Sequence, residues 1–127
     1  MSSFTKPLDV RKIGKRTWMT LAPFAYHVGK ESSAEVVLVP KGFKTDFASV
    51  PRPFWIIFPP DGEYTQATVL HDYMYFKQLY IRKECDEIFY DAMGVLTVIK
   101  WKRIIMYQAV RRFGWIGWRK HDKKNKK

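Results

Sequence analysis

The spacing of hydrophobic positions changes about halfway along this 127-residue chain. In the first half, short runs rich in Thr, Trp, Tyr and Val predict strands, because these side chains suit a pleated surface. The runs cover Arg16 to Leu21, Phe24 to Gly29 and Glu35 to Pro40. We therefore expect a small antiparallel sheet in the N-terminal half, preceded by a loose polar arm over residues 1–16.

In the second half, apolar residues recur three and four positions apart, which is the spacing of one helix face. The clearest example is the stretch from Arg82 to Ile99. An earlier helix is expected from Asp61, a suitable N-cap residue, to about Gln78, and a later one from Trp101 to Arg112. The fold class expected is α+β, with the small sheet packed against three helices as a single domain over residues 1–118.

The charge of the chain is concentrated at its C-terminal end. Residues 100–127 contain eleven Lys and Arg against a single acid, Asp122, which gives a net charge of +10 out of +11 for the whole chain. Such an asymmetry favours contact with a polyanion, which could be nucleic acid, an anionic membrane or an acidic protein surface. The alternative is a solubilising tail, and residues 119–127 are expected to be a basic, disordered segment.

Aromatic residues are interleaved with these cations. Stacked aromatics beside Arg and Lys hold single-stranded nucleic acid, and Trp with Lys also marks membrane interfaces. The candidates for contact with nucleic acid or another surface are Arg111, Arg112, Trp115, Trp118, Arg119 and Lys120. Alternatively, the tryptophans close the hydrophobic core.

Other features bear on the location of the protein. No apolar run approaches the roughly 20 residues of a spanning helix, and the N-terminus lacks the pattern of a signal peptide. The lone Cys85 cannot form an internal disulfide, which fits a reducing compartment, and its helical position predicts a core thiol. We expect a location in the cytoplasm or in an assembled particle.

The loop after the third predicted strand concentrates polar groups. Asp46, Ser49 and Arg52 lie close together there, with Pro51 and Pro53 stiffening the backbone. In a functional interpretation, Asp46 is a metal ligand or general base, and Ser49 or Arg52 holds substrate. In a structural one, the side chains satisfy the backbone of a sharp turn.

Two further segments place polar groups in apolar helices. His71 and Asp72 interrupt the first predicted helix, and Asp86 follows Cys85 in the second. Successive helical residues diverge by about 100°, so His71 and Asp72 cannot point the same way. Asp86 pairs with an arginine such as Arg82, or approaches His71 to bind a divalent metal or set the imidazole tautomer.

These segments resemble a family of short phage and prophage proteins catalogued only as a domain of unknown function. The resemblance rests on three stretches, Gly-Phe-Lys-Thr-Asp-Phe-Ala-Ser-Val-Pro (residues 42–51), Leu-His-Asp-Tyr-Met-Tyr (70–75) and Asp-Glu-Ile-Phe-Tyr-Asp-Ala-Met (86–93). It implies a bacteriophage or prophage origin, and with it a location in the host bacterial cytoplasm or in a phage virion. It brings no established activity. The polar signature positions are Asp46, Ser49, His71, Asp72 and Asp86.

The leading functional hypothesis is a phage-encoded, metal-assisted hydrolase of an anionic substrate. Asp46, His71 and Asp86 form the metal or catalytic centre in that scheme, Asp72 or Asp86 orients water, and Arg52 holds the substrate. One alternative is a virion or assembly component whose basic C-terminus contacts DNA or a neighbouring subunit, with the polar cluster as a brace. Another is a phage effector that binds a host protein.

Overall fold

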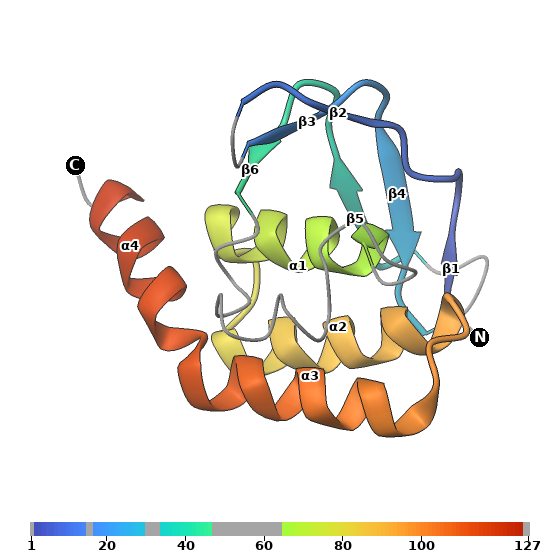
Figure 1. The fold of residues 1–127 in the computed structure, drawn as a ribbon, viewed down its shortest axis with the longest axis vertical. Coiled ribbons are helices and arrows are strands. Elements are labelled where there is room, and N and C mark those ends of the chain that lie inside the picture. The colour runs from blue at the N-terminus through green and yellow to red at the C-terminus, as the bar shows by residue number, and fades with distance from the viewer. Residues whose placement is uncertain (1, 15–16, 30–33, 47–64, 126–127) are drawn as a thin grey trace. The chain divides into compact units, whose positions relative to one another are not determined.

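The computed structural model describes residues 2–14, 17–29, 34–46 and 65–125. The chain divides into two compact units, Met1–Asp46 and Phe47–Lys127. Strands occur in the first unit and helices in the second (Figure 1). The α+β class is therefore confirmed.

The first unit contains two small antiparallel sheets, where one was expected. The first has the strand order β1 (Ser3–Phe4), β4 (Phe24–His27), β5 (Val36–Val39), and the second has β2 (Val10–Lys12), β3 (Trp18–Thr20), β6 (Lys44–Thr45). β1 and β2 come from the N-terminal arm that was expected to be loose. The arm is ordered because its backbone pairs with later strands, Ser3 opposite His27 and Val10 opposite Thr20.

The strands predicted from β-branched and aromatic runs are present, with the expected alternation. In β5, Val37 and Val39 are buried whereas Val36 and Leu38 are exposed. One face of a strand therefore faces the interior and the other faces solvent, as a period of two requires.

The second unit contains α1 (Thr65–Lys77), α2 (Arg82–Val95), α3 (Lys100–Phe113) and α4 (Trp115–Asn125). α2 packs against both α1 and α3, and α4 packs against α1 and α3 (Figure 1). α4 occupies most of the segment expected to be a disordered tail. None of the helices in the described ranges is long and apolar enough to cross a bilayer.

α2 ends at Val95, four residues before the predicted boundary at Ile99. The chain turns at Thr97, which has a left-handed φ of 61°. The Val98 N–H then bonds the Met93 carbonyl and the Thr97 N–H bonds the Gly94 carbonyl. This arrangement satisfies the carbonyls at the helix end, and it starts α3 at Lys100.

α1 is buried along most of its length, from Gln66 to Tyr75. Its predicted N-cap, Asp61, lies outside the described residues. A helix that is buried on several sides has no solvent-facing stripe for polar groups. His71 and Asp72 therefore lie in the interior of the protein, where they need polar partners.

Candidate functional site

The Asp86 carboxylate is the centre of a buried polar cluster in the second unit. Asp86 is on α2 and has no exposed surface. Its Oδ1 accepts hydrogen bonds from His71 Nε2 at 2.7 Å and from the Tyr75 hydroxyl at 2.6 Å. Its Oδ2 accepts a hydrogen bond from Arg111 Nη1 at 2.7 Å. One carboxylate therefore joins α1, α2 and α3.

Helical spacing explains how these groups meet. His71 and Tyr75 are four residues apart on α1, so both side chains leave the same face of that helix. Arg82 and Asp86 have the same spacing on α2, with Arg82 Nη1 at 3.7 Å from Asp86 Oδ2. The two helix faces meet because α1 packs against α2.

The two arginines connect the cluster to the end of α3. Arg82 donates hydrogen bonds from its guanidinium to the carbonyl oxygens of Val110 and Arg111. Its side chain is 23% exposed and that of Arg111 is 28% exposed. The cations therefore reach solvent, while the carboxylate that they neutralise does not.

The His71 ring packs against two aromatic rings. Its centroid lies 4.2 Å from that of Tyr75 and 4.6 Å from that of Phe89. An ionised carboxylate only accepts hydrogen bonds, so contact with Asp86 fixes a proton on His71 Nε2. In the neutral ring, Nδ1 then carries the lone pair. Nδ1 is buried and has no hydrogen-bond partner among the residues that the structure describes.

The surroundings shift the pKa values of the groups at the centre. Burial raises the pKa of Asp86, but the hydrogen bonds from His71, Tyr75 and Arg111 outweigh it, so the pKa is held below its ordinary value. Burial, followed by the Asp86 charge and hydrogen bond, raises the pKa of the Tyr75 hydroxyl. The cluster thus favours an ionised carboxylate beside a neutral phenol.

Cys85 is buried next to this cluster on α2. Burial, and then the neighbouring Asp86 charge, raise the pKa of its thiol to about 12. Because the thiolate is the nucleophile, a thiol with this pKa is unreactive at neutral pH.

α4 closes one side of the cluster through a glycine. Trp118 packs edge-on against Tyr75, with ring centroids 5.2 Å apart. A Cβ atom on Gly114 would come within 2.6 Å of the Tyr75 hydroxyl oxygen. Gly114 therefore allows the start of α4 to approach the hydroxyl that bonds Asp86.

The remaining predicted site residues are placed as follows. Asp46 is half-buried at the end of the first unit, and Ser49 and Arg52 lie outside the described residues. Asp72 is buried in α1. Within the described ranges, no group of three or more His, Cys, Asp or Glu side chains is arranged to hold a metal ion.

The contacts of Asp86 also affect its proposed role as a metal ligand. Its oxygens already accept three hydrogen bonds, and two guanidinium groups neutralise its charge. A carboxylate with these partners is better suited to orient His71 than to ligate a cation directly. The available ligand atom in the cluster is His71 Nδ1.

The six residues predicted to contact a polyanion fall into two groups. Arg111 bonds Asp86 and Trp118 packs on Tyr75, so both take part in the internal structure. The other four are exposed on α3 and α4: Arg112, Trp115, Arg119 and Lys120.

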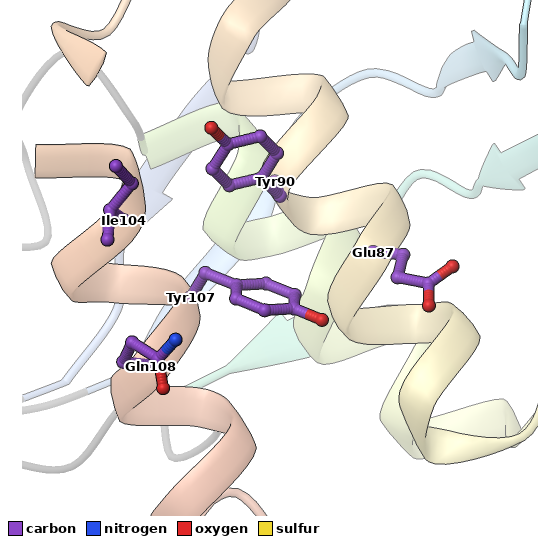
Figure 2. Close-up of a pocket in the computed structure, with 5 residues that line it drawn as sticks. All are labelled: Glu87, Tyr90, Ile104, Tyr107 and Gln108. Carbon is purple, nitrogen blue, oxygen red and sulfur yellow. The ribbon is translucent and has the colours of Figure 1, made fainter. Parts of the chain in front are cut away.

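A separate groove of about 360 Å³ lies between α2 and α3 (Figure 2). It is lined by Glu87, Tyr90, Ile104, Tyr107 and Gln108. The Tyr107 ring extends from α3 towards α2 and meets Tyr90 edge-on, with centroids 5.6 Å apart. None of the groove residues contributes to the Asp86 cluster.

The comparisons with known proteins place this architecture in a family. Residues 18–110 match the family model described as "Protein of unknown function (DUF1353)". The chain belongs to the DUF1353 family. The matched range includes His71, Tyr75 and Asp86 of the buried cluster, whereas Arg111 and α4 lie beyond it.

A curated relative is also uncharacterised. The chain is 37% identical over 78 residues to the uncharacterized protein y4jT of Sinorhizobium fredii (strain NBRC 101917 / NGR234). That alignment covers 60% of this chain and 23% of the relative, so the chain spans less than a quarter of the relative's length. No solved structure matches the chain.

Two members of the cluster were not predicted. Tyr75 lies in the stretch 70–75 that carries the family resemblance but is not among the predicted site residues, and Arg111 is predicted only as part of the basic surface. The i,i+4 spacing of His71 and Tyr75 was a usable signal for the tyrosine. No comparable signal existed for Arg111, which is 25 residues from Asp86 in the sequence.

Proposed function

We propose that this DUF1353 protein is a small hydrolase in which His71 is the general base and Asp86 its orienting carboxylate. The observation that carries the proposal is the buried His71 Nδ1 atom, which has no partner in the described structure while Nε2 is fixed by Asp86. A carboxylate that fixes one ring nitrogen leaves the other free to accept a proton. We further propose a bacteriophage or prophage origin, on the basis of the sequence resemblance.

In the proposed mechanism, His71 Nδ1 takes a proton from water as the water attacks the ester, the bond to the alcohol oxygen breaks, and the imidazolium returns the proton to the departing alcohol. Asp86 stabilises the imidazolium that forms, and Tyr75 and Arg111 hold the carboxylate in position. If the reaction is metal-assisted, His71 Nδ1 would be one ligand of the metal and Asp86 the outer partner of the histidine, and further ligands would have to come from outside this cluster. An anionic substrate such as a phosphate ester remains the proposed class.

Full burial of both His71 and Asp86 favours an alternative. In that case the cluster is a brace that joins three helices, and the protein is a non-enzymatic virion or assembly component. A brace and a catalytic pair share the same tautomer, because both keep the Asp86 bond at Nε2. They differ in that only the catalytic pair predicts turnover or metal binding that depends on His71.

The decisive experiment combines hydrolysis and metal uptake with stability measurements. Purified protein is assayed against p-nitrophenyl phosphate, bis(p-nitrophenyl) phosphate and p-nitrophenyl acetate, with and without Zn²⁺ or Mn²⁺. The variants are His71→Gln and Asp86→Asn, and His27→Gln on β4 is the control. We expect turnover or stoichiometric metal binding that is lost in His71→Gln and retained in His27→Gln.

Nitrogen-15 NMR of the histidine rings tests the geometry independently of any substrate. The proposal requires the neutral His71 ring to be protonated at Nε2 and unprotonated at Nδ1. A ring protonated at Nδ1 would leave no lone pair for the proposed base and would refute the mechanism. A His71→Gln variant that loses stability, while the wild type neither turns over these esters nor binds metal, would establish the brace.

A further inference from the structure

The two sides of α4 differ in burial and in chemistry. Gly114 and Gly117 are buried and Trp118 packs on Tyr75, so this side faces the helical unit. The opposite side carries Trp115, Ile116, Arg119 and Lys120, which line one shallow hollow of about 410 Å³. We call these four residues the α4 outer face.

The α4 outer face is both apolar and cationic. Trp115 is 46% exposed and Ile116 is 59% exposed, and the next helical turn carries the exposed Arg119 and Lys120. Large apolar side chains that remain this exposed indicate an interaction site when they occur together.

The outward side of α3 repeats this composition. Trp101, Ile104 and Ile105 are exposed at positions i, i+3 and i+4, and Ile99 is exposed just before the helix. The sequence contains no acidic residue from position 100 to 121, whereas it contains seven Lys and Arg there. The helices of this region therefore expose apolar groups within a strongly positive field.

We propose that the α4 outer face binds the surface of an anionic lipid membrane. Trp115 and Ile116 enter the boundary between headgroups and acyl chains, and Arg119 and Lys120 contact the lipid phosphates. This is the arrangement of an interfacial helix, in which buried apolar area and attraction to anionic lipid act together.

The side chains favour lipid over nucleic acid. Single strands are held by cations and by aromatic rings on which bases stack. Isoleucine cannot stack in this way, yet isoleucines make up four of the exposed apolar residues of this region, at positions 99, 104, 105 and 116. Aliphatic groups gain free energy on leaving water for hydrocarbon, whereas phosphate-lined surfaces offer them no such environment.

Vesicle co-sedimentation tests the proposal. The full chain is mixed with vesicles of equal parts phosphatidylglycerol and phosphatidylcholine, or of phosphatidylcholine alone. We expect binding to the anionic vesicles, a loss of at least about thirtyfold in Arg119→Glu/Lys120→Glu, and a loss of about tenfold or more in Ile116→Ser.

Matched variants in the first unit control for charge and for hydrophobicity. Lys41→Glu/Lys44→Glu makes the same change in net charge at exposed positions, and Leu38→Ser removes an exposed aliphatic side chain. Both should bind anionic vesicles within about twofold of wild type. All variants are checked by circular dichroism and should melt like wild type, because surface changes have small effects on stability.

Two results would overturn the proposal. One is equal binding by the wild type and the Arg119→Glu/Lys120→Glu variant, or by the Ile116→Ser variant. The other is a wild-type protein that does not bind vesicles but binds a single-stranded oligonucleotide, with an affinity that falls steeply as the salt concentration rises. That result would assign the surface to nucleic acid.

Discussion

Replacing Asp86 by Asn tests whether the buried cluster stabilises the helical unit. The amide has nearly the same shape but one acceptor oxygen and one donor group. If its oxygen keeps the bonds from His71 and Tyr75, its NH₂ group faces the donors of Arg111; if it turns round, the NH₂ group faces His71 and Tyr75 instead. The first orientation places donors against donors at Arg111. In the second, the Tyr75 hydroxyl can rotate to accept, but His71 Nε2 accepts only if the ring proton moves to Nδ1.

The magnitude follows from the bonds that are lost. A hydrogen bond to a charged group contributes about 1.5–3 kcal/mol, and a neutral one about half as much. Asp86→Asn loses the Arg111 bond and weakens the other two. Arg111 is partly exposed and regains water, which offsets some of the loss. We expect the free energy of unfolding to fall by about 3 kcal/mol.

Urea denaturation followed by circular dichroism measures this difference. Glu87→Gln is the matched control, because it makes the same charge change at the next residue of α2 but at an exposed position. It should change stability by less than about 0.5 kcal/mol. An Asp86→Asn variant no less stable than Glu87→Gln would refute the reasoning.

The same pair of variants has a pH signature. The folded pKa of Asp86 is lowered, so its stabilising contribution is present above the unfolded value of about 3.9. It is lost as the pH falls from there through the folded pKa. The stability difference between wild type and Asp86→Asn should therefore shrink on acidification below about pH 4, and a constant difference down to about pH 2 would contradict this.

Three further predictions concern single residues. The pKa of Tyr75 is raised in the folded protein, so ionisation of this phenol favours unfolding once the pH exceeds its pKa in the unfolded chain, about 10. In thermal melts between about pH 10 and 11, Tyr75→Phe should therefore lose less stability than wild type. An unchanged profile would argue against this assignment. Cys85 has a pKa of about 12 in the folded protein. At about pH 8 it should therefore react with Ellman's reagent at least about a hundredfold more slowly in folded than in urea-unfolded protein. Comparable rates in the two states would show an accessible thiolate. Thr97 occupies a left-handed conformation that costs a non-glycine residue about 1 kcal/mol, so Thr97→Gly should raise the melting temperature. The control Ala34→Gly, at an exposed position without a positive φ, should not raise it. A lower melting temperature in Thr97→Gly would disprove the strain.

Periodicity in the sequence identified most regular elements and the core side of α2. Seven residues were expected on one face: Cys85, Ile88, Phe89, Ala92, Val95, Leu96 and Ile99. The first four are buried, the next two are half-buried, and Ile99, which lies beyond the end of the helix, is exposed. This works because helical burial follows a local repeat of 3.6 residues, whatever the partner helix is. The end of α2 was missed because it depends on one non-glycine residue in a left-handed conformation, which composition does not reveal.

The ordering of the N-terminal arm and of α4 could not be predicted from local sequence. Ser3 and Val10 lie in a polar segment with weak strand signals, and they form strands by pairing with residues ten or more positions away. α4 and the residue before it carry two glycines and many cations, and its buried side packs against α1 through Trp118 and Tyr75. Long-range contacts stabilise both segments against their local preferences.

By itself, the sequence determined the α+β class, the polar residues that interrupt the apolar helices, and the concentration of positive charge after residue 100. Only the tertiary structure decided that Asp86 binds His71, Tyr75 and Arg111 together, and that Trp118 turns inward while Trp115 stays exposed. The physical reason is that a local pattern fixes which face of a helix is apolar, whereas packing between helices decides which polar groups on those faces come within hydrogen-bonding distance.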